Sequence, residues 1–88
     1  MYFVEFSRDA EKDISKIDKA IAQRILSKVK WLSENFDYIT PQTLKGQFQK
    51  FYKSRVGDYR ILYTVHQENK KLVVHLIGHR REIYKQNQ

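Results

Sequence analysis

The sequence predicts an α+β fold in which two N-terminal helices pack on one face of a small, largely antiparallel β-sheet. Apolar residues recur at helical spacing in the first half of the chain, whereas segments of the second half alternate as strands do. The dipeptide Gly57-Asp58 joins two of these segments as a hairpin turn. The 88 residues are expected to form one domain over 1–88, near the size at which a single core is only just sufficient.

The first half predicts a short strand followed by two helices. Residues 2–6 alternate as a strand, and Ser7 and Asp18 stand where helix N-caps are expected. Pro41 and Gly46 bracket the loop that ends this half. The stripe of the longer helix that is expected to face the core is Ile21, Ile25, Val29 and Leu32, widened by Ala22, Leu26 and Phe36.

The second half predicts three strands over residues 48–56, 59–66 and 72–77. The first turn places Arg55 opposite Arg60, and a second turn centred on Asn69-Lys70 places Arg60 opposite His79. The face expected to lie under the helices carries Tyr59, Ile61, Tyr63, Val65, Val74 and Leu76. The face expected to be open and basic carries Lys53, Arg55, Arg60, Leu62, Thr64, His75, Ile77 and His79.

The positive charge is confined to the second half. Residues 1–44 hold seven Lys and Arg against seven Asp and Glu, whereas residues 45–88 hold ten against three, which accounts for the net charge of +7. Such a surplus is typical of proteins that bind nucleic acid or another polyanion. Cysteine is absent, and neither a membrane-spanning run nor a signal-peptide pattern is present. The chain is therefore expected to be cytoplasmic and free of membrane association.

Arg55 and Arg60 are the most informative pair. Like charges directly opposite each other destabilise a sheet, so a chain that carries such a pair is expected to use it for an anion. Lys53 projects from the same face because it lies two residues before Arg55. Three cations on one face predict a phosphate site.

Such a site suits cleavage of an RNA phosphodiester. Cations stabilise the charge of the transition state, a base removes the 2′-OH proton and an acid protonates the leaving oxygen. Arg55 and Arg60 are candidate clamps because arginine stays protonated, and Lys53 and His79 are candidate bases. Tyr84 is expected either to stack on a nucleobase or to pack at the chain end. The sequence has no metal-ligand spacing and no Gly-rich phosphate loop, so no cofactor is expected.

Several motifs resemble the RelE/ParE toxin superfamily. They are VEFS at residues 4–7, LKG at 44–46, RVGDYRILY at 55–63 and IGHRREIY at 77–84. The resemblance implies a RelE-like fold and the toxin half of a bacterial or archaeal toxin–antitoxin pair. RelE-type members cleave messenger RNA in the ribosomal A site without metal, leaving a 2′,3′-cyclic phosphate, whereas ParE-type members inhibit DNA gyrase.

The resemblance also implies roles for single residues. Lys53 matches the family's base or phosphate clamp, and Arg60 matches its phosphate-stabilising arginine. Arg80 matches the general acid or transition-state stabiliser, and Tyr84 matches the tyrosine that stacks on the substrate base. Strict alternation would send Arg80 to the covered face, so a bulge at Gly78 is expected to re-aim it.

Two positions depart from the best-known member, which has lysine at both. Arg55 removes one candidate base, and His79 offers a different one. Three functions stay open: a ribosome-dependent endoribonuclease, a ParE-like inhibitor of gyrase, and an inert antitoxin-binding regulator. The implied partners are a cognate antitoxin, the ribosome with its messenger RNA, and operator DNA only through the antitoxin complex. The residues expected to contact the RNA backbone are Lys45, Lys50, Arg81 and Lys85.

Overall fold

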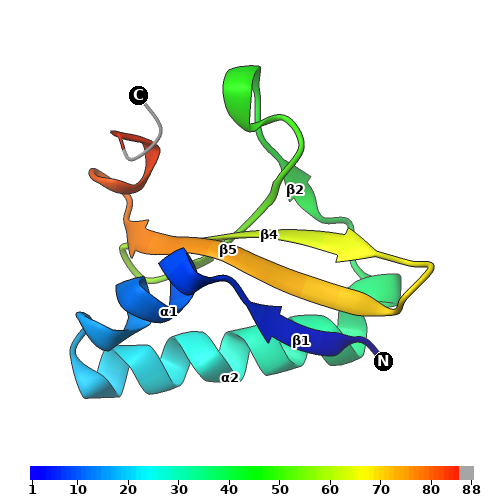
Figure 1. The fold of residues 1–88 in the computed structure, drawn as a ribbon, viewed down its shortest axis with the longest axis horizontal. Coiled ribbons are helices and arrows are strands. Elements are labelled where there is room, and N and C mark those ends of the chain that lie inside the picture. Colours follow the sequence, from blue (N-terminus) through cyan, green and yellow to red (C-terminus); the bar gives the residue numbers. More distant parts are fainter. Residues whose placement is uncertain (86–88) are drawn as a thin grey trace.

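The computed structural model describes residues 1–85 and places two helices against one face of a five-stranded sheet (Figure 1). The α+β prediction is confirmed. Short 3-10 helices lie at Phe36–Tyr38, Gly46–Phe48 and Ile83–Lys85. The main elements are β1 (Phe3–Phe6), α1 (Arg8–Ser15), α2 (Lys19–Asn35), β2 (Gln42–Thr43), β3 (Tyr52–Val56), β4 (Tyr59–His66) and β5 (Lys71–His79).

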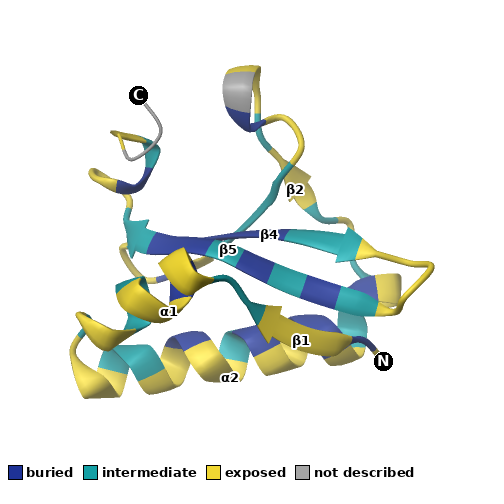
Figure 2. Cartoon of the chain, viewed as in Figure 1, coloured by how far each residue is buried: buried dark blue, intermediate teal, exposed yellow. Residues whose placement is uncertain are grey.

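The sheet has the strand order β1-β5-β4-β3-β2. β1 runs parallel to β5, and the other neighbours are antiparallel. Figure 2 shows buried and partly buried residues alternating along β5, while the outer side of α2 is exposed. Among residues 1–85, no helix is long and apolar enough to cross a membrane.

Both predicted helix caps are confirmed. The Ser7 hydroxyl accepts a hydrogen bond from the Ala10 amide at 3.1 Å, and the Asp18 carboxylate accepts one from the Ala20 amide at 3.1 Å. The predicted stripe of α2 is buried at Ile25, Val29 and Leu32. Leu26, expected to widen that stripe, instead points outward with 45% of its surface exposed.

The first hairpin has the predicted register but a later start. Val56 pairs with Tyr59 and Arg55 with Arg60 across a turn in which Gly57 has a φ of 57°, the left-handed backbone that glycine adopts without strain. β3 begins at Tyr52 rather than at Phe48. Phe48 instead lies in a 3-10 helix, and its side chain packs in a second apolar cluster.

The predicted register of the second hairpin is wrong, and its turn is centred one residue earlier than expected. Leu62 pairs with Leu76 but Tyr63 pairs with Val74, so His75 is an extra residue that bulges from β5. The bulge reverses the alternation that follows it. Leu76 therefore lies on the face away from the helices, whereas Ile77 joins the core beneath them.

Contacts from α1 hold this bulge in place. β1 pairs with β5 only as far as Val74, and beyond that point α1 takes over the strand edge. The Ser7 hydroxyl donates to the His75 carbonyl at 2.8 Å, and the Ile77 amide donates to an Asp13 carboxylate oxygen at 2.9 Å. Backbone groups of β5 beyond the end of β1 thus keep partners.

The face predicted to be open is partly covered. Two arms rise from it on the side opposite the helices (Figure 1): the loop arm, residues 42–51, and the C-terminal arm, residues 80–85. They enclose an apolar cluster separate from the main core. Its buried members are Phe48, Leu62, Leu76 and Ile83, with Leu44, Phe51 and Tyr84 packed around them.

Candidate functional site

The three hairpin cations share one face of the sheet, as predicted. Lys53 pairs with Leu62, whose side chain belongs to the cluster away from the helices. Arg60 lies two residues before Leu62 and Arg55 lies opposite Arg60, so alternation gives all of them the same side. The cations lie between the hairpin turn and this apolar cluster.

Arg60 is held by the backbone of its own hairpin. Its Nη1 donates to the carbonyls of Gly57 and Tyr59, each at 3.2 Å. The side chain is half-buried, whereas that of Arg55 is exposed. The carbonyl dipoles offset part of the repulsion between the two guanidinium groups and fix one of them before any anion arrives.

Arg80 joins this face through the bulge in β5. Its amide donates to the Asp58 carbonyl at 2.8 Å, which extends the β4–β5 ladder one position beyond the Tyr59–His79 pair. Arg80 therefore lies on the same side as Arg60 by alternation. The predicted re-aiming occurs, but the extra residue is His75 rather than Gly78.

The Arg80 side chain meets an acidic turn residue. Its Nε is 3.7 Å from an Asp58 carboxylate oxygen, and the two side chains are 51% and 67% exposed. A pair that is so open to water contributes little to stability, so a phosphate group can replace the carboxylate at modest cost. The sequence pattern identifies Asp58 only as a turn residue. Nothing in the residues around it indicates a contact with Arg80, which lies far along the chain.

His79 does not join the cations, contrary to the predicted pairing with Arg60. It pairs with Tyr59, whose ring centroid is 5.7 Å from its own, and Tyr59 packs against the main core on the helix side. Arg60 lies opposite Gly78 instead. The His79 Nδ1 accepts from the Arg81 amide at 3.2 Å. Of the two candidate bases, only Lys53 shares the face of Arg60.

Tyr84 is half-buried in the apolar cluster between the arms. Its ring lies 5.4 Å from that of Phe48 in an edge-on arrangement, which ties the C-terminal arm to the loop arm. The packing alternative for Tyr84 is thus present, and the residue as a whole is only partly buried.

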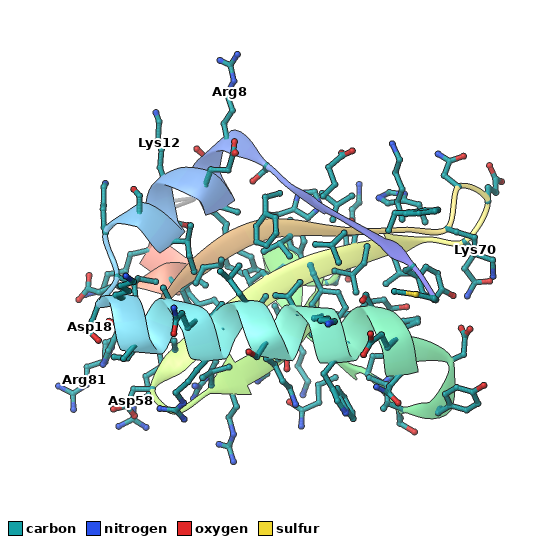
Figure 3. The ribbon with its side chains drawn as sticks, turned by 90° about the horizontal axis from the view of Figure 1, so that it is seen from below. Arg8, Lys12, Asp18, Asp58, Lys70 and Arg81 are labelled. Atoms are coloured by element: carbon teal, nitrogen blue, oxygen red, sulfur yellow. The ribbon has the colours of Figure 1, made fainter. Side chains whose placement is uncertain are left out.

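The other predicted contact residues are exposed on the arms. Lys45 and Lys50 lie on the loop arm, and Arg81 and Lys85 lie on the C-terminal arm. Figure 3 shows Arg81 at the same end of the molecule as Asp58, the end where the hairpin turn lies. The arms therefore add positive charge around the face that carries the hairpin cations.

His75 belongs to a hydrogen-bonded group with Thr64 and His66. The Thr64 hydroxyl lies 2.8 Å from His75 Nε2 and 3.0 Å from His66 Nε2. Burial lowers the pKa of His75 below its ordinary value, and the neighbouring His66 adds to the effect. This cluster lies toward the far end of β4 from Arg60. Within residues 1–85, no group of three or more His, Asp or Glu residues is placed to hold a metal ion.

Comparison with known proteins assigns this fold to a class of small toxins. Residues 4–84 match the family described as the ParE toxin of the type II toxin–antitoxin system, parDE. A protein of Escherichia coli assigned as a RelE-like toxin is 34% identical over 80 residues, which are 90% of this chain and 83% of that protein. The chain belongs to the RelE/ParE superfamily, the toxins of type II toxin–antitoxin systems, and is RelE-like.

Solved structures agree on the fold. The RelBE2 toxin–antitoxin complex of Mycobacterium tuberculosis matches with a TM-score of 0.78 at 24% identity, covering 89% of this chain and 96% of that chain. The isolated Escherichia coli RelE toxin matches with 0.76 at 25% identity, covering 90% and 84%. The toxin in the intact Escherichia coli RelBE complex also matches with 0.76 at 25% identity, covering 90% and 96%.

Proposed function

We propose that this toxin is an endoribonuclease that cleaves messenger RNA on the ribosome by attack of a 2′-OH on the adjacent phosphate, without a metal. The observation that carries the proposal is the convergence of Arg60 and Arg80 beside Arg55. A sheet tolerates opposed arginines poorly, and an anion with developing negative charge is the ligand that such a set stabilises.

The proposed roles are those that the family resemblance implies, with Arg55 as a second clamp. Lys53 takes the 2′-OH proton as the 2′-oxygen bonds to phosphorus. Arg55 and Arg60 hold the non-bridging oxygens. The bond from phosphorus to the 5′-oxygen breaks, the Arg80 guanidinium stabilises the charge that develops on that oxygen, and the oxygen takes a proton from solvent. The products are a 2′,3′-cyclic phosphate and a free 5′-OH.

The arms extend this site along the RNA. Tyr84 stacks on a base with the exposed part of its ring, because aromatic rings commonly hold unstacked RNA bases. The exposed cations of the arms contact neighbouring phosphates: Lys45, Lys50, Arg81 and Lys85.

A cognate antitoxin is the expected partner, and the expected location is the cytoplasm, where translating ribosomes are found. The relatives from Mycobacterium tuberculosis and Escherichia coli were solved as toxin–antitoxin complexes, which supports this partner. Operator DNA is expected to be bound only through the antitoxin complex. The whole chain, 1–88, acts as a single domain.

A second candidate function is inhibition of DNA gyrase, because the family that the chain matches is described by its ParE toxin. Induced expression in a bacterial host distinguishes the two. We expect growth to stop and mapping of messenger 5′ ends to show new cuts inside translated codons, with plasmid supercoiling unchanged. Intact messages together with lost supercoiling would establish the gyrase function instead. Arg60→Ala is the control and is expected to abolish the cuts.

A further inference from the structure

A pocket opens where the hairpin meets α2. Its volume is about 630 Å³, and Lys28 and Trp31 of α2 line it together with Lys53, Arg55 and Arg60 of the hairpin. None of the described residues that line it is acidic. The pocket therefore continues the positive charge of the candidate site around the side of the sheet toward the helix layer.

The pocket exists because β2 is very short. β2 pairs with β3 only at Tyr52 and Lys53, so in the described chain no strand pairs with the outer edge of β3 from Ser54 onward. An uncovered strand edge leaves room for another chain to approach. At this edge the cations of β3 and the side chains of α2 line a common space.

Trp31 is the unusual residue of this pocket. It leaves 43% of its surface exposed on α2, although tryptophan is usually well buried. The Lys28 Nζ, one helical turn earlier, lies over this ring at 4.5 Å from its centroid, so a stacking base either replaces the ammonium group or uses the other face of the ring. An exposed aromatic plane next to cations is the combination with which proteins hold single-stranded RNA: the plane stacks on a base and the cations bind its phosphate.

We propose that this pocket, the α2 pocket, binds one nucleotide of the RNA next to the cleaved phosphodiester. The base stacks on Trp31, and Lys28 contacts its phosphate. The proposal rests on the proposed function, since it extends the path of the same RNA. An acidic peptide would also be attracted by the charge, but its carboxylate side chains have no ring to stack on Trp31, whereas every nucleotide carries both a phosphate and a planar base.

Trp31 reports on the pocket directly because it is the chain's single tryptophan. Titration with a short 2′-O-methyl RNA, which cannot be cleaved, is expected to quench its fluorescence. Added salt is expected to weaken the binding, because phosphate contacts release counterions. Lys28→Gln is expected to weaken binding by roughly threefold to tenfold, as for the net contribution of one hydrogen bond. Lys30→Gln, a matched change on the same helix outside the pocket, is expected to alter it less than about twofold.

Variants at Trp31 are compared by the anisotropy of a labelled 2′-O-methyl RNA. Trp31→Leu is expected to weaken binding by roughly tenfold, within the range for loss of one stacked base, and Trp31→Phe is expected to restore most of it. Equal binding by Trp31→Leu would overturn the proposal even if messenger RNA is still cut. Stronger quenching by an acidic peptide of equal charge would assign the pocket to a peptide. Quenching by RNA together with intact cellular messages would refute the proposed nuclease activity and leave the nucleotide pocket standing.

Discussion

Arg60 is the residue in which stability and function compete most directly. It lies opposite Arg55, yet its guanidinium donates to two carbonyls of its own hairpin at 3.2 Å. Repulsion and hydrogen bonding act in opposite directions, and each is worth on the order of 1 kcal/mol. We therefore expect removal of the side chain to change the free energy of unfolding by less than about 1 kcal/mol.

Lys53 and His79 can be separated as candidate bases. If Lys53 takes the 2′-OH proton, Lys53→Ala is expected to change the shape of the pH–rate profile of cleavage, whereas loss of a mere clamp lowers the rate equally at every pH. His79→Ala is the control, because the His79 side chain lies on the opposite face of the sheet from Arg60. The measurement is single-turnover cleavage on programmed ribosomes at a series of pH values. A profile altered only by His79→Ala would reverse the assignment.

Among the elements, the bulged strand β5 determines whether the site is complete. A single extra residue, His75, reverses the side-chain alternation and so brings Arg80 to the face of Arg60. The bulge depends on α1, whose Asp13 accepts the Ile77 amide at 2.9 Å. The helix on one face of the sheet thus helps to set the chemistry on the other.

Asp13→Ala tests this dependence. Loss of the acceptor leaves the partly buried Ile77 amide unpaired, which is expected to lower the free energy of unfolding by about 1–3 kcal/mol. Hydrogen exchange of the Ile77 amide should accelerate, and cleavage should fall as Arg80 shifts. Asp13→Asn keeps an oxygen acceptor and should lose less. Glu11→Ala, at an exposed site in the first turn of α1, should cost less than about 1 kcal/mol. Unchanged exchange at Ile77 in Asp13→Ala would show that the bulge forms without α1.

Across the whole molecule, the features that could be predicted are those formed by residues close together in the sequence. The caps at Ser7 and Asp18 and the turn at Gly57-Asp58 are local signals, and each is confirmed. The bulge and the second apolar cluster depend on contacts between distant residues, such as Asp13 with Ile77. Asp13 and Ile77 are too far apart in the sequence for a local pattern to predict their contact.

In the candidate site, too, local features could be predicted and long-range ones could not. Lys53, Arg55 and Arg60 lie within one hairpin, so their shared face could be predicted from alternation and turn length. The prediction for His79 failed for two reasons: the second turn is centred one residue earlier than expected, and the bulge then shifts the register again. Arg80 reached the predicted face through that same bulge.

Single-turnover cleavage of messenger RNA on programmed ribosomes tests the proposed chemistry most directly, with the wild type compared with Arg60→Ala and Arg80→Ala. Each substitution is expected to lower the rate by roughly two to three orders of magnitude, the loss typical of a preorganised charge stabiliser. Thermal unfolding should show both variants folded, and Lys30→Ala should cleave normally. Full activity of either arginine variant would contradict the assignment, as would an activity loss that merely follows unfolding.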